Sequence, residues 1–553
     1  MQLNSIKDTI FDTASNNNQT LSWHGSLETI AFNPKEIQAK LLHLDKPCYF
    51  VSRQGEIGVT NDGYLDNAQT SETKIVTAIP PLVPQQLGDR SFREFHRVKY
   101  AYAAGAMANG IASEELVIAL GKAGIFSSFG AAGLVPSRIE RAINTIQDAL
   151  NNKPYAFNLI HSPSEPAIEQ KTVDLYLKHR VNTVEASAFL SLSPNIVYYR
   201  VAGLSLDAEA RIQIKHKVIA KISRREVATK FMQPTPDNIL KQLVSQGLIT
   251  ELQAKLAAKV PLADDITVEA DSGGHTDNRP LVALLPSIIA LRDEIQAKYN
   301  YQTPIRVGAA GGIGTPQSAL GAFMMGAAYV VTGSINQSCV EAGASEHTKQ
   351  LLAQAEMADV MMAPAADMFE MGVKLQVLKR GTMFGMRSQK LYEYYRNYSS
   401  IEEIPPQERS KLEQQIFRKS LAEVWQDTIS YFEQRDPMQI ERAINNPKSK
   451  MALIFRSYLG LSSRWSNIGE PGREIDYQIW CGAAMGAFND WVRGSYLAEP
   501  SNRRVVDLAE HLMTGSAYLY RMQNLKLQGI SMPAEYWNYR PKAINSKNHV
   551  NRF

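Results

Sequence analysis

The sequence contains little cysteine, and its cysteines are not spaced for a metal site or a disulfide framework. Cys48, Cys339 and Cys481 are the only three, and they lie far apart along the chain. A Cys-based zinc site needs pairs a few residues apart, and a disulfide framework needs more cysteines than this. We therefore expect neither kind of site.

Nucleotide-binding signatures are also missing. No G-x-G-x-x-G occurs, and alanine follows the one Gly-Lys pair, Gly121–Lys122. A Rossmann dinucleotide fold and a Walker-type ATPase thus lose their main support. The sequence also has no large excess of charge of one sign, since 59 Lys and Arg against 55 Asp and Glu leave a net charge of +4. Bulk charge therefore gives no reason to expect a nucleic-acid partner.

Long hydrophobic runs are absent as well. The N-terminus lacks an apolar signal region. The uncharged stretch 307–340 is interrupted by glycines and Pro316, so its longest apolar part is shorter than the ~18 residues a membrane span requires. We expect a cytoplasmic protein without a membrane span.

What is present is a globular composition and a length sufficient for two to four domains. Hydrophobic residues make up 44% and charged residues 21% of the 553 positions. Residues 1–90 contain short strand-like runs, which predict a small β-rich segment. Residues 391–541 are helical in pattern, and the polar end, 542–553, predicts a flexible tail.

The central part, residues 91–390, alternates strand-like and helical segments. Eight strand-like runs end in glycine or small residues, and they are 99–107, 124–133, 155–160, 181–187, 217–223, 265–275, 304–312 and 328–334. Alternation of this kind predicts parallel pairing, and eight units in about 250 residues match a (β/α)8 TIM barrel. An open doubly wound sheet is the alternative. A ninth run, 195–203, follows the fourth without an obvious helix between them and is interpreted as a loop.

Glycine-rich loops follow the seventh and eighth predicted strands. Gly311, Gly312 and Gly314 precede a helix that begins near Pro316, and Gly333 and Ser334 follow the last strand. In barrels of this type, these loops commonly bind phosphate through glycine amides. The alternative is that these glycines only allow close helix packing.

The sixth predicted strand ends in Asp271, Ser272, Gly273, Gly274 and His275. Barrel chemistry lies at the C-terminal ends of strands, and a histidine can exchange protons near neutral pH. His275 is therefore a candidate for proton transfer. The alternative is a histidine on a surface loop.

Three other strands carry polar residues that would be costly to bury alone. Asn158, Glu185 and Lys221 occur in the third, fourth and fifth runs. Asn158 and Lys221 are candidates for contact with a cofactor ring at the barrel mouth. Alternatively, Glu185 and Lys221 pair with each other.

Two basic stretches, 215–230 and 379–396, contain Arg224, Arg225, Arg387 and Lys390. Such runs are usually solvated faces. The functional alternative is a positive rim that attracts phosphorylated ligands or an acidic partner protein.

Several of these segments together resemble a known family. The segment 106–133, FNL at 157–159, ADSGGH at 270–275, VGAAGGIG at 307–314 and the segment 329–352 resemble, in order, the motifs of nitronate monooxygenase (2-nitropropane dioxygenase)-like FMN barrels. RGTMFGMRSQKLYEYYR and GREIDYQIWCGAAMGAFNDW resemble one branch, the trans-acting enoyl reductases of bacterial polyunsaturated fatty-acid and polyketide synthases. The helical part is similar to the helical subdomain of malonyl-transferase-like acyltransferases, but no Gly-x-Ser-x-Gly elbow accompanies it.

The resemblance implies FMN at the barrel mouth and NADPH or NADH as hydride donor. Ala106 and Met107 would contact the isoalloxazine, with Asn158 and Lys221 near the ring. His275 would transfer the proton. The glycine-rich loops would hold the ribityl phosphate. Their residues in this role would be Ser272, Gly273, Gly274, Gly311, Gly312, Gly333 and Ser334.

At two places the sequence departs from the family pattern, and each departure weakens the assignment of family roles to residues of this chain. The family's Gly-Thr-Arg-Phe is Gly333 to Asn336 here, so the phosphate loses an arginine. Asp271 and Ser272 replace a Glu-Ala pair, which leaves the polar partner of His275 undefined.

The resemblance implies an enoyl reductase that acts on 2-enoyl thioesters carried by acyl carrier protein domains of a multi-subunit synthase, and it allows a homodimer. Two alternatives remain, a nitronate-oxidising flavoenzyme for small molecules and a non-catalytic synthase component. The helical part and the basic segments favour the reductase, since a tiny substrate needs neither.

Overall fold

The computed structural model describes residues 21–66, 73–163 and 166–544. The chain divides into two compact units, Met1–Gln86 with Thr514–Tyr539 and Leu87–Met513 with Arg540–Phe553. Most of the predicted tail, from residue 545 on, lies outside the described residues. The boundaries predicted at residues 90, 390 and 541 stay predictions.

The second unit contains a closed barrel of eight parallel strands, so the predicted (β/α)8 fold is confirmed. All eight predicted runs contribute a strand. Around the barrel the order is β12 (Lys217–Ile222), β13 (Asp265–Glu269), β15 (Arg306–Ala310), β16 (Val330–Thr332), β6 (Tyr102–Ala104), β7 (Phe126–Phe129), β8 (Ala156–Ile160) and β9 (Thr183–Ser187).

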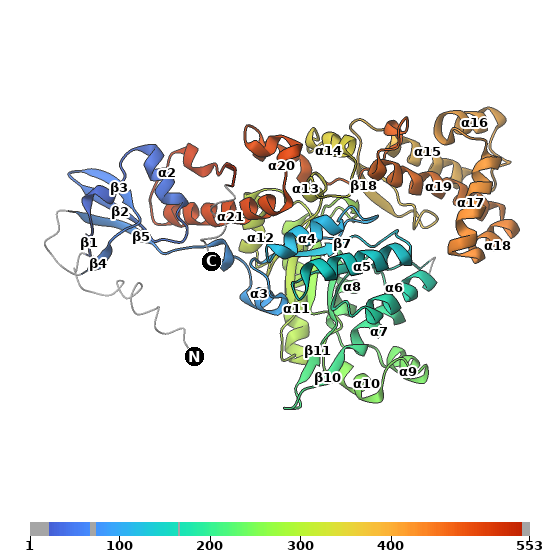
Figure 1. Cartoon of the computed structure of the whole chain (residues 1–553), viewed down its shortest axis with the longest axis horizontal. Helices are drawn as coiled ribbons and strands as arrows, with labels where there is room; N and C mark the ends of the chain where they lie inside the picture. Colours follow the sequence, from blue (N-terminus) through green and yellow to red (C-terminus); the bar gives the residue numbers. More distant parts are fainter. Residues whose placement is uncertain (1–20, 67–72, 164–165, 545–553) are drawn as a thin grey trace. The chain divides into compact units, whose positions relative to one another are not determined.

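Helices follow the strands and cover the outside of the barrel, as the long helix α11 beside the green strands illustrates (Figure 1). Their apolar faces are buried, because parallel strands need a covering layer. The helices of this part of the chain are α3 (Arg90–His96), α4 (Glu114–Lys122), α5 (Pro136–Leu150), α6 (Pro166–Lys178), α7 (Pro194–Ala202), α8 (Arg225–Met232), α9 (Asp237–Ser245), α10 (Glu251–Ala257), α11 (Leu281–Tyr299), α12 (Pro316–Met324), α13 (Ser334–Gln337) and α14 (Glu346–Ala353). Of these, α3 precedes the first barrel strand, and α14 packs against α19 (Pro447–Ile468) and α20 (Ala484–Val492).

The interpretation of residues 195–203 as a loop is wrong, because residues 195–202 belong to α7 and Gly203 is its C-cap. The Ser193 side chain accepts a hydrogen bond from the Ile196 amide, and Pro194 occupies the first turn. Ile196 and Val197 are buried. The strand-like look of this segment comes from β-branched and aromatic residues, but the N-cap and the packing of its buried face decide for helix.

The end of the barrel opposite the strand C-termini is closed by a buried charged network. Asp265, at the start of β13, accepts hydrogen bonds from Arg306 (Nε–Oδ1 2.6 Å) and lies 2.8 Å from Nε2 of His96. All three side chains are at most 2% exposed. A paired, buried cluster at this end of a barrel serves stability rather than chemistry.

Beyond the last barrel strand the chain forms a small sheet that the sequence did not predict. β17 (Val360–Pro364) and β18 (Lys374–Leu378) form an antiparallel hairpin, and β14 (Gly274–His275) pairs with β18. This pairing fixes the loop after β13 to a segment about 100 residues later.

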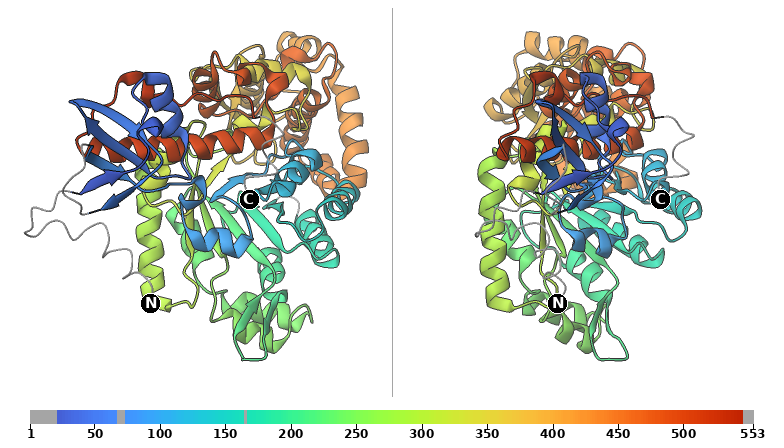
Figure 2. Two further views of the ribbon diagram at one scale, coloured as in Figure 1. Left: turned by 60° about the vertical axis from the view of Figure 1, so that its left-hand side comes forward. Right: turned by 90° about the vertical axis from the view of Figure 1, so that its left-hand side faces the viewer.

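The predicted helical region is confirmed. Figures 1 and 2 show its helices gathered beyond one end of the barrel, in brown and orange. They are α15 (Phe384–Asn397), α16 (Pro406–Lys411), α17 (Leu421–Arg435), α18 (Pro437–Asn445), α19 (Pro447–Ile468) and α20 (Ala484–Val492).

The first unit is an antiparallel five-stranded sheet with helices, so the predicted β-rich N-terminal segment is also confirmed. It includes residues from the C-terminal end of the chain, within α21 (Val505–Leu527). The buried Arg521 donates hydrogen bonds to four backbone carbonyls, those of Leu41, His43, Leu44 and Lys46. The other elements of this unit are β1 (Ser22–His24), α2 (Pro34–Leu42), β2 (Cys48–Arg53), β3 (Glu56–Thr60), β4 (Tyr64–Asp66) and β5 (Lys74–Ile79).

Candidate active site

The C-terminal ends of the barrel strands open into one cavity of about 1360 Å³. Residues of the helical region complete its wall. His275 and all the residues that the family resemblance assigns to FMN line this cavity, and these are Ala106, Met107, Asn158, Lys221, Ser272, Gly273, Gly274, His275, Gly311, Gly312, Gly333 and Ser334. The structure thus brings together residues spread over about 230 positions of sequence.

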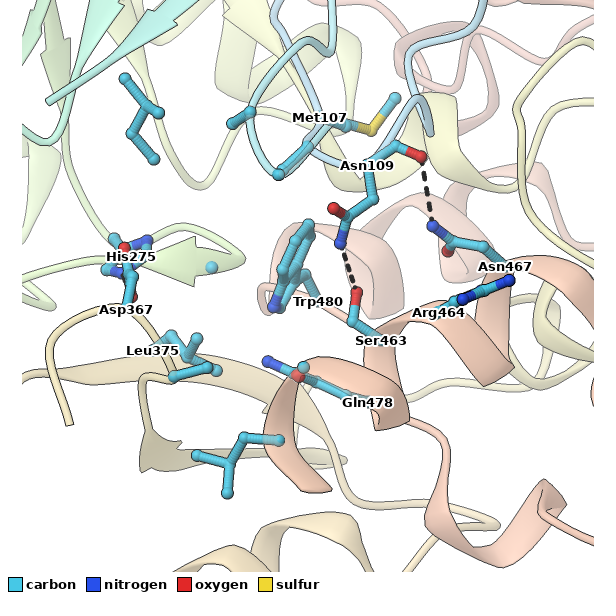
Figure 3. Close-up of a pocket in the computed structure, with 18 of the residues that line it drawn as sticks. Met107, Asn109, His275, Asp367, Leu375, Ser463, Arg464, Asn467, Gln478 and Trp480 are labelled. Carbon is cyan, nitrogen blue, oxygen red and sulfur yellow. Dashed lines mark hydrogen bonds and ion pairs between the residues drawn. The ribbon is translucent and has the colours of Figure 1, made fainter. Parts of the chain in front are cut away.

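His275 forms an ion pair within this cavity. Its Nε2 lies 3.0 Å from Oδ1 of Asp367, and the two side chains are 31% and 38% exposed (Figure 3). Burial opposes the charged imidazolium, but the Asp367 charge and hydrogen bond outweigh burial, so the pKa of His275 is raised above 6.5. His275 is therefore held ready to carry a proton near neutral pH.

Asp367 supplies the partner that the sequence left undefined. It lies between β17 and β18 and lines the same cavity. Burial alone would raise the pKa of its carboxyl group, but His275 lowers the pKa below its usual value. No local motif marks Asp367, because its partner is 92 residues away and meets it only through the β14–β18 pairing.

Lys221 lies between two carboxylates at the base of the cavity. Its Nζ is 2.9 Å from Glu269 and 3.7 Å from Glu185. Burial disfavours the ammonium, but these two carboxylates raise the pKa of Lys221. The alternative in which Glu185 pairs with Lys221 is thus confirmed, with Glu269 as the nearer partner, and contact between Lys221 and a cofactor stays a prediction.

Asn158 is 5% exposed and is oriented by two hydrogen bonds. Its Nδ2 donates to the carbonyl of Glu185 (3.0 Å) and to the hydroxyl of Ser187 (2.9 Å). These bonds occupy both amide protons, so the side-chain oxygen is the group left to accept a hydrogen bond from a ligand. The Ala106 amide is engaged elsewhere, with Glu185 (3.3 Å).

The glycine loops leave open space at particular positions. A side chain built on Gly274, Gly312 or Gly333 would meet no atom within 4 Å. By contrast, a Cβ on Gly311 would lie 2.7 Å from the backbone of Ala270. Gly311 therefore allows close packing, whereas the open positions border space that a ligand can fill.

The amides available for a phosphate differ from those expected at the start of α12. Thr315 and Ser318 form a capping box, and the amides of Gly314 and Thr315 donate to the Ser318 hydroxyl. Those amides are therefore already occupied. The amide of Gly312 makes no backbone hydrogen bond within the described part of the chain.

Gln337 is a candidate ligand-binding residue that the sequence did not indicate. It is 2% exposed and lines the cavity, four residues after Gly333. Its Nε2 is buried and has no hydrogen-bond partner among the described residues. A buried donor without a partner is costly unless a ligand satisfies it, and Gln337 follows the loop in which the family's arginine is missing.

Helix α19 and the segment before α20 cover the barrel mouth. The Asn109 side chain donates to the Ser463 hydroxyl (2.8 Å), and Asn467 donates to the Asn109 carbonyl (3.4 Å). Figure 3 shows Trp480 between these residues and His275. The cavity is thus enclosed by the barrel on one side and by the helical region on the other.

The predicted basic rim is only partly present. Arg387 is 15% exposed and pairs with the fully buried Asp476, so its assignment to an exposed rim is wrong. Arg224 pairs with Asp277 (2.9 Å), and this pairing is the main reason why the pKa of Asp277 is lowered to about 2. These arginines are already paired with carboxylates of their own chain, which weakens their attraction for an acidic partner.

Two further observations concern the described part of the chain. It contains no cluster of three or more His, Cys, Asp or Glu side chains suited to a metal ion. None of its helices combines the length and the apolar character of a membrane span.

Comparison with protein-family models gives three matches. The model for nitronate monooxygenase matches residues 90–391. The model for the N-terminal domain of the fatty acid synthase subunit PfaD matches residues 23–81. The inserted helical domain of [acyl-carrier-protein] S-malonyltransferase matches residues 398–477.

The curated relatives are polyunsaturated fatty acid synthase subunits and polyketide biosynthesis proteins. Two polyunsaturated fatty acid synthase proteins of Thraustochytrium sp. are similar to this chain. The first is 46% identical over 90% of this chain and 33% of its own length, and the second is 48% identical over 85% of this chain and 23% of its own length. Polyketide biosynthesis protein PksE of Bacillus subtilis is 41% identical over 94% of the chain and 68% of its own length. The chain thus spans a third or less of the two Thraustochytrium relatives.

One solved structure is similar in both fold and sequence. The enoyl reductase domain of MlnA, from the macrolactin biosynthesis cluster of Bacillus amyloliquefaciens, superimposes with a TM-score of 0.76 at 40% identity. The match covers 80% of this chain and 99% of that domain.

Proposed function

Because this chain belongs to the nitronate monooxygenase family, we propose that it is an FMN-dependent enoyl reductase that acts in trans on 2-enoyl thioesters. The substrate would be carried by an acyl carrier protein of a polyunsaturated fatty-acid or polyketide synthase, and NADPH or NADH would be the hydride donor. The similarity to the MlnA enoyl reductase domain and to the synthase proteins supports this assignment.

The observation that carries the proposal is the position of the His275–Asp367 pair. It lies in the same cavity as the open glycine loops at the C-terminal ends of the barrel strands. With FMN at these loops, one cavity would combine a proton donor with a hydride donor, the two groups that reduction of an activated double bond requires.

The residues present fit FMN. Its phosphate would accept hydrogen bonds from the amide of Gly312 and from the side-chain nitrogen of Gln337. Among the described residues, that nitrogen has no other partner. The ring would contact the turn at Ala106 and Met107 and donate a hydrogen bond to the Asn158 oxygen. When bound, FMN would supply the hydride that is transferred to the β-carbon of the enoyl thioester.

His275 would supply the proton to the α-carbon. Its Nε2 is engaged by Asp367, so Nδ1 is the nitrogen left to face a substrate. Asp367 is a positioning residue, since it orients the ring and stabilises the charged imidazole. Trp480 and α19 cover the cavity, and their side chains would exclude water during the reaction.

A spectrum followed by two additions tests this proposal. Purified protein should be yellow, release FMN on denaturation, bleach with NADPH under anaerobic conditions and regain colour when crotonyl thioester is added. Oxygen consumption with an alkyl nitronate, but no reoxidation by crotonyl thioester, would instead identify a nitronate-oxidising enzyme. Protein that stays colourless and binds no added FMN would indicate a non-catalytic synthase component.

A further inference from the structure

The cavity is larger than one cofactor requires. Its volume is about 1360 Å³, whereas pockets for single small molecules typically measure roughly 300–1,000 Å³. The additional space extends away from the barrel, along α17 and α19 of the helical region. A second ligand therefore has room beside a bound flavin.

Helix α19 lines this extension with most of its residues from Arg456 to Ile468, and the residues named next share one of its faces. Ser457, Gly460, Leu461, Arg464 and Ile468 all line the cavity and recur at helical spacing. Leu461 is 41% and Ile468 is 59% exposed. This face therefore presents apolar side chains and one arginine to the cavity.

Gly460 makes this face unusually open. It lies inside α19, where glycine is less favourable than alanine. A Cβ at this position would meet no atom within 4 Å, so packing does not require glycine there. The missing side chain widens the cavity beside Leu461 and Arg464.

Two cations of the cavity wall have no ionic partner in the described part of the chain. They are Arg141 of α5 and Arg464 of α19, both exposed, and Figure 3 shows Arg464 on α19 near Asn467. The other Lys and Arg side chains of the wall already form ion pairs with carboxylates. These pairs are Arg138 with Glu114, Lys221 with Glu269, Lys419 with Asp427, Arg456 with Glu370 and Arg473 with Asp476. Among the acidic wall residues, only the Glu470 carboxylate lacks a cation within the described ranges.

We propose that Arg141 and Arg464 bind the phosphate of the phosphopantetheine arm that carries the substrate, and that Leu461 and Ile468 contact the apolar part of this arm. The inference rests on the proposed function and names how its substrate is held. A guanidinium group binds phosphate with two parallel hydrogen bonds and keeps its charge at any relevant pH. Because Leu461 and Ile468 beside Arg464 are apolar, the site favours phosphopantetheine, which has one phosphate and a less polar arm, over NADPH, which has several phosphates.

Charge reversal with three matched substrates tests the inference. In Arg464→Glu and Arg141→Glu, the KM for crotonyl-phosphopantetheine should rise about 10-fold or more, as expected for loss of a charged hydrogen bond. The KM for crotonyl-N-acetylcysteamine, which has the same thioester but no phosphate, should stay within about twofold, as should the KM for NADPH. Titration calorimetry with phosphopantetheine alone should show the same loss of affinity.

Arg442→Glu is the matched control, because Arg442 is an exposed arginine of α18 outside the cavity wall. It should leave all these measurements unchanged. A rise in the KM for NADPH, with no change for crotonyl-phosphopantetheine, would overturn the inference and assign the arginines to the dinucleotide. An equal rise for both thioesters would also overturn it.

Gly460→Phe tests the same wall by size rather than charge. The side chain has room to point into the cavity, so it should raise the KM for crotonyl-phosphopantetheine several-fold without loss of FMN. Gly460→Ala, the control, should behave like the wild type. An unchanged KM in Gly460→Phe would show that the arm does not pass α19. If the wild type reduces neither thioester, the proposed function fails, whereas the charge-reversal results judge the inference alone.

Discussion

At the scale of single residues, the proposed proton transfer depends on how the charge of His275 is stabilised. The imidazole is partly buried, which disfavours its charged form, and Asp367 at 3.0 Å more than compensates. The pair is thus a charged acid whose proton is retained to higher pH than in a solvent-exposed histidine.

We predict that His275→Ala slows reduction of crotonyl thioester by roughly 10²–10⁴-fold, the range typical for loss of a general acid. Flavin reduction by NADPH should fall much less, because no proton from His275 is needed in that half-reaction. Stopped-flow measurement of the two half-reactions separates these effects. Unchanged turnover would limit His275 to a structural role.

We predict that Asp367→Asn shifts the pH dependence of turnover. A raised pKa means that His275 loses its proton only as pH rises through that value, so activity falls on the alkaline side. Without the Asp367 charge the pKa drops, and the alkaline decline should begin at lower pH. The pH profile of kcat measures this shift, and an unmoved profile with normal FMN content would contradict it.

At the scale of elements, short loops between strands and helices decide which groups reach the cavity. Gly312 has φ +73° and space around its missing side chain. The capping box at the start of α12 uses the amides that follow, so the loop itself is the part left for an anion.

We predict that Gly312→Asp weakens FMN binding by about 100-fold or more, because its carboxylate would lie against the phosphate. Gly312→Asn is the matched control, since it has the same shape and the same left-handed backbone but no charge. FMN content after purification and titration of the stripped protein measure both variants. Equal losses in the two variants would point to backbone strain instead of charge.

At the scale of the whole molecule, the N-terminal sheet forms one unit with a late segment of the chain, Thr514–Tyr539. Arg521 is the clearest link within that unit. It is fully buried, and it donates to four carbonyls of residues 41–46.

We predict that Arg521→Met destabilises the first unit by about 2–4 kcal/mol, because several buried carbonyls lose a charged donor. Lys526→Met on the same helix removes an exposed charge and should change stability by less than about 0.5 kcal/mol. Thermal denaturation and proteolysis of residues 21–86 would measure both. Equal sensitivity of the two variants would refute this role of Arg521.

Much of the barrel could be predicted from the sequence because its signals are local. Each strand ends in small residues and is followed by a helix, and the glycine loops and the turn before His275 stand at those strand ends. Parallel pairing then brings the ends together, so His275 and the residues expected to hold FMN meet in one cavity. The family resemblance added FMN and enoyl reduction as expectations.

The tertiary structure alone decided the contacts between distant segments. Asp367 meets His275 through a pairing of β14 with β18, and Arg387 pairs with Asp476, 89 residues away. Residues 195–202 look like a strand locally but form α7, because tertiary packing outweighs intrinsic propensity. Local sequence determines most of the barrel's strands and helices and where glycine and histidine stand along them. Only the folded chain determines which charges meet, since Coulomb interactions depend on distance in space rather than along the sequence.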